Sequence, residues 1–327
     1  MIISRTPFRV SFAGGGTDLA AFYRAEKGAV TSSAIDKYVY ITVNKRFDKT
    51  IRISYSKTEI VDDADQVQHR IVREALRLTG LRQGLEITSI ADLPAGTGMG
   101  SSSAFTVGLL HALHAYAGRH ASAAQLAEEA CHIEIDVLGE PIGKQDQYAS
   151  AFGGLNHIEF NPDGTVYINP VISSRETREE LGSNLMLFYT GVTRSASQVL
   201  AKQKEDTAAK LAVLRQMRDI SDRMAKVFQA GRRLHEFGQL LHEAWLLKRS
   251  VTSGISNPDI DRWYDVAREA GALGGKLLGA GGGGFLLFFV ERQNRRAVAK
   301  RLGDLRNCPS GLSPKGPKSF TWEDSRP

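Results

Sequence analysis

The segment Pro94–Ala104 places three glycines at alternate positions directly before three serines. Glycine lets the backbone bend so that successive amide groups face one point, and a following helix adds its unpaired N–H groups and positive dipole end. We interpret the segment as a phosphate cradle, because a flexible loop with a serine helix cap explains the pattern less well. The lysine of the P-loop pattern is absent. The assigned residues are Gly96, Thr97, Gly98, Met99, Gly100, Ser101, Ser102 and Ser103.

A second glycine run, Gly279–Gly284, formally contains G-x-G-x-x-G. A dinucleotide site needs that pattern between a strand and a helix, whereas this run leads into an apolar strand expected at Phe285–Val290. An NAD-dependent oxidoreductase, the alternative enzyme class, rests on this run alone. A tight turn would hardly need four consecutive glycines. We therefore expect close approach to a ligand or to another domain's site, with Gly281 and Gly282 as substrate contacts.

A third glycine cluster ends the first expected strand and leads into a carboxylate, in the order Gly14-Gly15-Gly16-Thr17-Asp18. Bare backbone beside a carboxylate suits a polyhydroxylated ligand, because Asp18 can accept hydrogen bonds from sugar hydroxyls. An N-cap role for Asp18 fits the spacing equally well. The candidate substrate contacts here are Gly15, Gly16, Thr17 and Asp18.

Two further acids are candidates for chemistry. Glu134 lies beside the apolar stripe of an expected helix, and a carboxylate so close to a buried face needs a partner, either a magnesium ion or an arginine. Asp146 stands at an expected helix start next to Lys144, where the dipole and the lysine both favour the ionised carboxylate. Its structural alternative is a helix cap.

Regular elements are expected to position these residues. Alternation predicts a strand at Ile2–Ala13, with Phe8, Val10 and Phe12 on one face and Arg9 and Ser11 on the other. Helical spacing and caps predict helices at Ser101–Tyr116, from Ser122 to Leu138, from Gln145, and at Leu234–Val251 and Ile260–Ala270. Further strands are expected at Tyr38–Val43, Ile51–Tyr55, Leu85–Ile90, Asn156–Phe160, Val166–Ile168 and Asn184–Tyr189. The polar segment Ile172–Gly182 is interpreted as a linker.

Composition bounds the class of protein. The chain has 327 residues, of which 42% are hydrophobic and 24% charged, so a globular protein of about two domains is expected. No apolar run approaches the roughly 20 residues of a membrane helix. Two cysteines, Cys131 and Cys308, make neither a disulfide scaffold nor a zinc spacing, and we expect the cytoplasm. The net charge of +6 suits a solvated surface or an anionic substrate; basic residues mixed with acids argue against an RNA-binding module, the third alternative.

Three blocks together resemble the motifs of the galactokinase, homoserine kinase, mevalonate kinase and phosphomevalonate kinase (GHMP) superfamily. They are Pro7–Asp18, Pro94–Ala104 and Lys276–Phe285, in the family's order and spacing. Ala34–Tyr40, Gly143–Tyr148 and Tyr189–Ala196 narrow the resemblance to the D-glycero-D-manno-heptose 7-phosphate kinase branch. Galactokinases carry glutamate and histidine where this chain has Gly15 and Gly16, which argues against galactose. A fucokinase- or galactokinase-like sugar-1-kinase is the alternative within the family.

The resemblance implies a role for each matching residue. The loop from Gly96 to Ser103 would wrap the phosphates of ATP, and Ser102 and Glu134 would bind Mg²⁺. Asp146 would face the attacking hydroxyl, with Arg9 or Lys144 offsetting charge. Asp18 would bind the sugar. Arg194 is a candidate for the phosphate that the sugar already carries.

The resemblance also implies an α+β fold of two domains with the active site between them. The expected parts are an N-terminal domain at 1–175 with a ribosomal S5 domain 2-like fold, a ferredoxin-like C-terminal domain at 182–303, and an irregular tail at 304–327. The expected partners are ATP and a small sugar phosphate, with no nucleic acid and no membrane, and a homodimer is one open assembly. The expected product is a sugar 1,7-bisphosphate for nucleotide-activated heptose, used in capsule or lipopolysaccharide.

Overall fold

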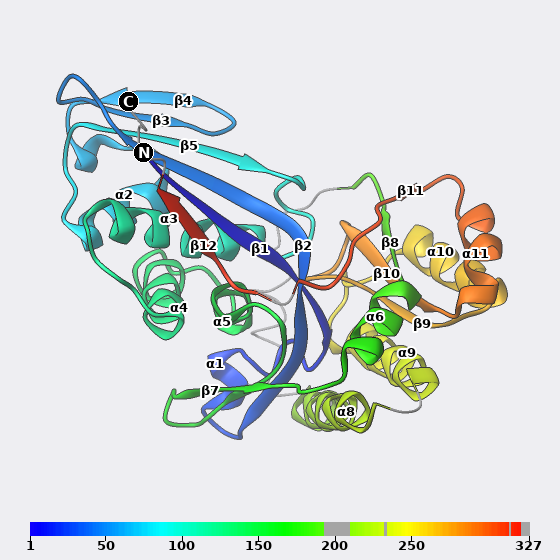
Figure 1. Ribbon diagram of the computed structural model, residues 1–327. Coiled ribbons are helices and arrows are strands. Elements are labelled where there is room, and N and C mark those ends of the chain that lie inside the picture. The colour runs from blue at the N-terminus through cyan, green and yellow to red at the C-terminus, as the bar shows by residue number, and fades with distance from the viewer. Residues whose placement is uncertain (193–209, 232–233, 314, 322–327) are drawn as a thin grey trace.

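The computed structural model describes residues 1–192, 210–231, 234–313 and 315–321, which form two sheets with helices packed on them (Figure 1). The first sheet runs β12-β1-β2-β5-β3-β4, and β6 and β7 join it through β2. Its strands are β1 (Ile2–Ala13), β2 (Gly28–Lys45), β3 (Ile51–Ser54), β4 (Thr58–Val61), β5 (Leu85–Ala91), β6 (Leu155–Phe160), β7 (Val166–Pro170) and β12 (Lys318–Thr321). The pairing of β3 with β5 is parallel, and the other pairings are antiparallel.

Helices gather on one side of this sheet, as Figure 1 shows for α2 to α5. The helical elements of this part are α1 (Ala20–Tyr23), the 3₁₀ turn Ala64–Gln66, α2 (Arg70–Thr79), α3 (Ser101–Tyr116), α4 (Ala123–Cys131), the π-helical turn His132–Val137, and α5 (Gln145–Phe152). Ser122 caps α4 as expected, because its hydroxyl accepts from the Gln125 backbone N–H. The predicted helix to Leu138 is thus completed by a π-helical turn, a form often found at functional sites.

The second sheet runs β11-β8-β10-β9 with antiparallel pairings throughout. Its strands are β8 (Leu185–Tyr189), β9 (Ala272–Leu277), β10 (Phe285–Val290) and β11 (Arg306–Asn307). Its helices are α8 (Leu211–Ala230), α9 (Leu234–Val251), α10 (Pro258–Glu269), the 3₁₀ turn Arg292–Asn294 and α11 (Arg295–Arg301). The succession strand, helices, two strands, helix, strand is the ferredoxin-like arrangement, so this expectation is confirmed.

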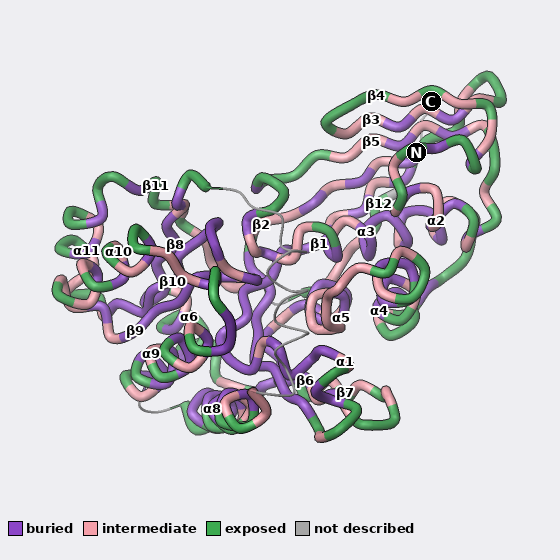
Figure 2. The backbone as a smooth tube through the Cα atoms, turned by 180° about the vertical axis from the view of Figure 1, so that it is seen from behind, coloured by how far each residue is buried: buried purple, intermediate pink, exposed green. Residues whose placement is uncertain are grey.

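The strand β1 is buried on both faces over its second half (Figure 2). Phe12 packs on Phe237 of α9 with ring centroids 5.1 Å apart and also contacts Phe228 of α8. The other face carries Arg9 and Ser11, and the ladder with β2 is irregular on either side of them. β-bulges of this kind re-aim side chains. The predicted alternation is therefore present, but the face that carries Arg9 and Ser11 is buried like the apolar face.

The strand β2 extends much further than the predicted Tyr38–Val43. Its first part, from Gly28, pairs with β6, and its last part pairs with β5. Small residues such as Ser32, Ser33 and Ala34 carry little strand preference by themselves. They are buried here because β1, β6 and α8 pack closely around them.

The predicted linker at Ile172–Gly182 is wrong, because α6 (Arg175–Asn184) occupies most of it. Ser174 caps this helix by accepting from the Thr177 backbone N–H at 3.1 Å. Thr177 and Leu181 are buried, and their spacing of four residues gives the helix a narrow inner face. The charged residues around them hide this helical pattern in the sequence. The expected domain limits at 175 and 182 stay a prediction.

The expectation of a wholly irregular tail is also wrong. β11 pairs with β8 at the edge of the second sheet, and β12 pairs with β1 at the edge of the first. Between them, Ser313 exchanges backbone hydrogen bonds with Ala34 and Gly154. Edge pairing needs only backbone N–H and C=O groups, so the glycine- and proline-rich tail has no side-chain period that would reveal it. The tail thus joins both sheets.

None of the helices within the described ranges combines the length and the apolarity that crossing a bilayer requires.

The two glycine loops meet backbone to backbone between the sheets. A Cβ atom on Gly279 would lie 2.4 Å from the Gly98 Cα, and one on Gly98 would lie 2.3 Å from the Leu278 carbonyl oxygen. A Cβ on Gly284 would lie 2.4 Å from the Thr97 carbonyl oxygen. Such contacts exclude every side chain, so Gly279 and Gly284 are glycines because they pack against the first loop.

Gly279→Ala should therefore destabilise the protein far more than its backbone conformation alone accounts for. Gly80 provides the matched control, because its φ of +74° equals that of Gly279 and a Cβ there has no neighbour within 4 Å. Urea unfolding should show a loss of about 1 kcal/mol for Gly80→Ala, from left-handed strain, and at least ~2 kcal/mol more for Gly279→Ala, from the clash. Equal losses would contradict the close packing of the loops.

Candidate active site

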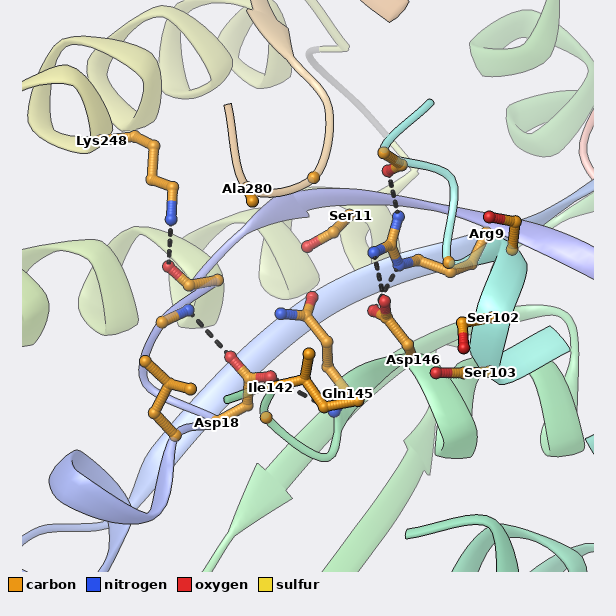
Figure 3. A pocket seen from close by; sticks show the side chains of 18 of the residues that line it. Arg9, Ser11, Asp18, Ser102, Ser103, Ile142, Gln145, Asp146, Lys248 and Ala280 are labelled. Atoms are coloured by element: carbon orange, nitrogen blue, oxygen red, sulfur yellow. Dashed lines mark hydrogen bonds and ion pairs between the residues drawn. The ribbon is translucent and has the colours of Figure 1, made fainter. Parts of the chain in front are cut away.

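A cavity of about 210 Å³ lies where the two sheets meet, between the glycine loops, the end of β1 and the start of α5 (Figure 3). Its walls come from both parts of the chain. The lining residues are Arg9, Ser11, Gly15, Gly16, Asp18, Leu19, Gly96, Gly98, Gly100, Ser101, Ser102, Ser103, Ile142, Gly143, Gln145, Asp146, Lys248, Lys276, Gly279 and Ala280.

The glycine–serine loop forms one wall as the sequence predicts. Gly96, Gly98 and Gly100 all have positive φ, between 70° and 79°, and Gly100 is the residue before the first turn of α3. Ser101, Ser102 and Ser103 then present the N-terminal turn of a 16-residue helix to the cavity. The predicted residues Thr97 and Met99 do not line it; both are buried, and the Thr97 hydroxyl donates to the Pro94 carbonyl at 2.8 Å. Alternate residues thus anchor the loop and leave the glycines facing the cavity.

Arg9 and Asp146 form a two-pronged ion pair in the cavity wall. The Arg9 Nε and Nη2 atoms donate to Asp146 Oδ1 and Oδ2 at 2.6 and 2.7 Å. The remaining nitrogen, Nη1, donates to the Gly98 carbonyl at 2.7 Å. Arg9 is almost wholly buried, whereas the Asp146 side chain keeps 23% of its surface exposed toward the cavity. Asp146 is therefore not a helix cap: one guanidinium fixes both this carboxylate and the glycine loop.

Asp18 lies beyond Asp146 along the cavity (Figure 3). Its carboxylate accepts from the backbone N–H groups of Gly16 at 2.8 Å and Gln145 at 3.3 Å, so it is no cap of α1, whose N-cap residue is Leu19. Burial raises the pKa of Asp18, while the Gly16 N–H lowers it. Gly15 and Gly16 line the cavity with Asp18, as predicted.

Thr17 is the exception in this cluster. It is buried, and its hydroxyl donates to the carbonyls of Gly14 and Ala29 at 2.8 and 3.0 Å and accepts from the Ala29 N–H. The hydroxyl therefore tethers the loop to β2, and Thr17 is not a residue of the cavity wall.

Glu134 stands behind the serines, on the π-helical turn. Its Oε1 accepts from the Ser102 hydroxyl at 2.6 Å and its Oε2 from the Gln147 amide at 2.7 Å. Neither contact is the arginine considered above as the alternative to a metal. Burial raises the pKa of Glu134 to about 7, although the hydrogen bonds from Ser102 and Gln147 lower it. An ionised carboxylate at this depth gains from a nearby cation.

Lys144 does not reach the cavity, which corrects its predicted catalytic role. Its ammonium group donates to the Gly164 carbonyl at 2.9 Å and lies 5.2 Å from the centre of the Tyr23 ring. Gly164 belongs to the turn between β6 and β7, so this turn holds the Lys144 side chain away from the cavity. A position next to Asp146 in sequence therefore does not put the amine next to its carboxylate.

Gly281 and Gly282 also lie outside the cavity wall. A Cβ on Gly281 would lie 2.5 Å from the Ile255 Cα, and the Gly282 N–H donates to the Ile255 carbonyl at 2.9 Å. Their neighbours Gly279 and Ala280 line the cavity instead. The run connects β9 to the antiparallel β10 without a helix, so the dinucleotide interpretation has no structural support. Arg194 lies outside the described residues.

Two lysines of the wall were not predicted as site residues. Lys248 of α9 and Lys276 of β9 are both buried, and both line the cavity. The Lys276 ammonium donates to the carbonyls of Ser11 and Phe12 at 2.8 and 3.3 Å. A signal for Lys248 existed in the sequence, because it falls on the buried stripe of α9 with Trp245 and Val251.

Comparisons with known proteins match both parts of the chain to one family. The family model described as "GHMP kinases N terminal domain" matches residues 66–154, and that described as "GHMP kinases C terminal" matches residues 224–305. The D-glycero-alpha-D-manno-heptose 7-phosphate kinase of Campylobacter jejuni is 31% identical, over 92% of this chain and 93% of that protein. The L-fucokinase/L-fucose-1-P guanylyltransferase of Bacteroides fragilis is 27% identical, over 95% of this chain and 36% of that protein.

Solved structures agree with this match. A crystal structure described as a D-glycero-D-manno-heptose 1-phosphate kinase from Bacteroides thetaiotaomicron superposes with a TM-score of 0.82 and 25% identity, covering 99% of this chain and 100% of that one. The Lactococcus lactis galactokinase shares the fold, with a TM-score of 0.77 at 18% identity and coverage of 97% and 95%. By these matches the chain belongs to the GHMP kinase family, whose members transfer a phosphoryl group from ATP.

Proposed function

We propose that the protein transfers the γ-phosphoryl group of ATP to the anomeric C1 hydroxyl of D-glycero-D-manno-heptose 7-phosphate. The observation that carries the chemistry is the Asp146 carboxylate, which is held by Arg9 beside the glycine–serine loop and remains open to the cavity. Likeness over the whole chain to the heptose 7-phosphate kinase supports the substrate. The 1,7-bisphosphate would serve nucleotide-activated heptose for surface polysaccharide. We place the enzyme in the cytoplasm and leave open whether it forms a homodimer.

The mechanism assigns the nucleotide and the sugar to different walls. Phosphoryl transfer passes through a loose transition state, so catalysis is mainly positioning and charge stabilisation. The backbone of the glycine–serine loop and the N-terminus of α3 would hold the β- and γ-phosphates. Asp146 orients the C1 hydroxyl and takes its proton as the hydroxyl oxygen bonds to the γ-phosphorus and the bond to the β-phosphate oxygen breaks, which releases ADP. Arg9 keeps Asp146 in place.

The sugar would lie between Asp146 and the glycine cluster at the end of β1. Asp18 is held by the backbone N–H groups of Gly16 and Gln145. Its oxygens suit sugar hydroxyls, and the bare backbone of Gly15 and Gly16 leaves room for a ring. The side-chain oxygen of Gln145 is buried and has no hydrogen-bond partner within the described ranges, which suits a hydroxyl donor from the sugar.

Ser102 and Glu134 fit a magnesium ion. A hydroxyl and a carboxylate are hard oxygen donors, and kinases bind Mg²⁺ through one or two carboxylates plus the phosphates of the nucleotide. The raised pKa of the buried Glu134 indicates a site that a cation would stabilise in its ionised form. Among the described residues no cluster of three His, Cys, Asp or Glu side chains exists, so such an ion would depend on the nucleotide for its other ligands. When bound, Mg²⁺ neutralises phosphate charge.

The purified protein should consume ATP with heptose 7-phosphate in preference to heptose 1-phosphate, mannose, fucose or galactose. ADP release measures the rate, and phosphorus NMR of the product identifies the carbon that carries the new phosphate. A C1 phosphate is expected. Turnover of fucose or galactose instead would favour the alternative sugar-1-kinases. Phosphorylation of heptose 1-phosphate at C7 would show that the order of the two phosphorylations is the opposite of the one proposed.

Asp146→Asn should lower kcat by roughly 10²- to 10⁴-fold, because the amide cannot take the hydroxyl proton. ATP binding should stay close to normal, since the glycine–serine loop is unchanged. Asp136→Asn is the matched control, because the Asp136 side chain is 67% exposed and pairs only with His132 in the described structure. Near-normal turnover of the Asp146 variant would show that the base lies elsewhere.

Glu134→Gln should raise the Mg²⁺ concentration needed for half-maximal activity by at least ~10-fold, since a charged ligand is lost. Glu128→Gln is the control, because Glu128 is exposed one and a half turns earlier on the same helical segment. Magnesium titrations at saturating ATP and sugar measure the effect. A variant with an unchanged magnesium requirement would remove Glu134 from the metal site.

A further inference from the structure

The second part of the chain contributes two buried amines to a cavity whose acids come from the first part. Lys248 and Lys276 expose 5% and 6% of their surfaces, and both line the wall formed by β1 and the glycine cluster. The Lys276 ammonium contacts the carbonyls of Ser11 and Phe12, and the Lys248 ammonium lies 3.5 Å from the Gly15 carbonyl. The mechanism above uses neither of them.

Burying an amine is unfavourable unless opposite charge or hydrogen-bond acceptors compensate for the lost solvation. Burial, together with the positive charges of Lys248 and Arg9, lowers the pKa of Lys276 to about 7. Burial lowers the pKa of Lys248 to about 8, while attraction to Asp18 opposes that shift. No ion pair to a carboxylate within 4 Å is formed by Lys276 in the described structure, so carbonyl oxygens alone receive its protons.

The adjacent Ser11 side chain is a second, independent indication of a ligand. Ser11 is 5% exposed and lines the cavity, yet its hydroxyl has no hydrogen-bond partner among the residues that the structure describes. A buried hydroxyl of this kind is usually satisfied by a ligand or by water. The Lys276 ammonium is bound to the backbone carbonyl of this same residue.

Position separates these groups from the nucleotide. Figure 3 shows Lys248 and Ser102 at opposite ends of the site, with Ser11, Gln145 and Asp146 between them. A sugar whose reacting hydroxyl meets Asp146 would therefore extend toward Lys248. An anion on its far end would approach Lys248 and the wall at Ser11, where the Lys276 ammonium is bound. An anion on the nucleotide would meet the glycine–serine loop first.

We propose that Lys248, Lys276 and the Ser11 hydroxyl bind the phosphate group that the sugar substrate already carries. This inference rests on the proposed function for the identity of the sugar. It makes the two lysines specificity determinants, because they would favour a sugar phosphate over the same sugar without its phosphate. Since the amines belong to α9 and β9 and Asp18 belongs to the first part of the chain, such a substrate would contact both parts.

The test compares Lys248→Met and Lys276→Met with wild type on heptose 7-phosphate and on the unphosphorylated heptose. Each variant should raise KM for the sugar phosphate by roughly 10- to 100-fold, the effect of one hydrogen bond to a charged group. KM for ATP and kcat/KM for the free sugar should change less than about threefold. Lys300→Met, in an exposed position on α11, is the matched control and should behave as wild type.

The outcomes discriminate between roles. A rise in KM for ATP equal to that for the sugar phosphate would overturn the inference in favour of a contact with the nucleotide. An equal fall in kcat/KM for both sugars would show that the lysines only stabilise the loops, which would contradict the inference. Thermal unfolding of each variant identifies a folding defect, and Lys248→Arg, which retains the charge, should then recover part of the selectivity.

A binding experiment separates this inference from the proposed function. Calorimetry with inorganic phosphate, on protein saturated with a non-hydrolysable ATP analogue, should show a site in wild type that Lys248→Met and Lys276→Met weaken by at least ~10-fold. If wild type turns over no heptose phosphate but binds phosphate through these lysines, the sugar assignment is wrong and the anion subsite stands. If phosphate binding is the same in all variants, the subsite is wrong.

Discussion

The site depends on a single guanidinium. Arg9 reaches Asp146 with two nitrogens and the Gly98 carbonyl with the third, so it fixes the distance between the carboxylate and the glycine–serine loop. A lysine offers no such fork, because its ammonium is a point charge. Burial strengthens these contacts, because electrostatic attraction is stronger where the local dielectric constant is low. The irregular β1 ladder around Arg9 is the local feature that lets a core strand present this side chain inward.

The rest of the fold serves to bring two loops together. The bent strands β1 and β2 carry the first part of the chain up to α8 and α9, where Phe12 packs on Phe237 and Phe228. The tail then pairs with an edge strand of each sheet. Packing, glycine contact and tail together restrict relative movement of the two sheets, which suits a reaction that requires donor and acceptor to be held in line.

Much of this arrangement was predictable because it depends on local pattern. The loop and helix at Gly96–Tyr116 and the strand at Ile2–Ala13 follow from glycine spacing and alternation, and the structure confirms both. Lys144 and Thr17 were misplaced because adjacency in sequence does not give side-chain direction, which turns and tertiary contacts decide. Gly281 and Gly282 were misplaced because their backbone packs on Ile255. Lys248 and Lys276 were missed because they lie far apart in the sequence, on α9 and β9, and only the fold shows that both line one cavity. The pairing of the tail depends on backbone groups alone and leaves no pattern.

The charges of the cavity form an ordered series from one end to the other. Amide dipoles and the start of α3 stand at one end, the Arg9–Asp146 pair follows, Lys276 is bound at Ser11, and Asp18 and Lys248 lie toward the other end. A substrate with one anionic end and a neutral, hydroxyl-rich middle complements such a series. The two lysines add positive charge to the walls that would face the sugar. The cavity is lined by side chains from both sheets, so the site is complete only when the two are packed together.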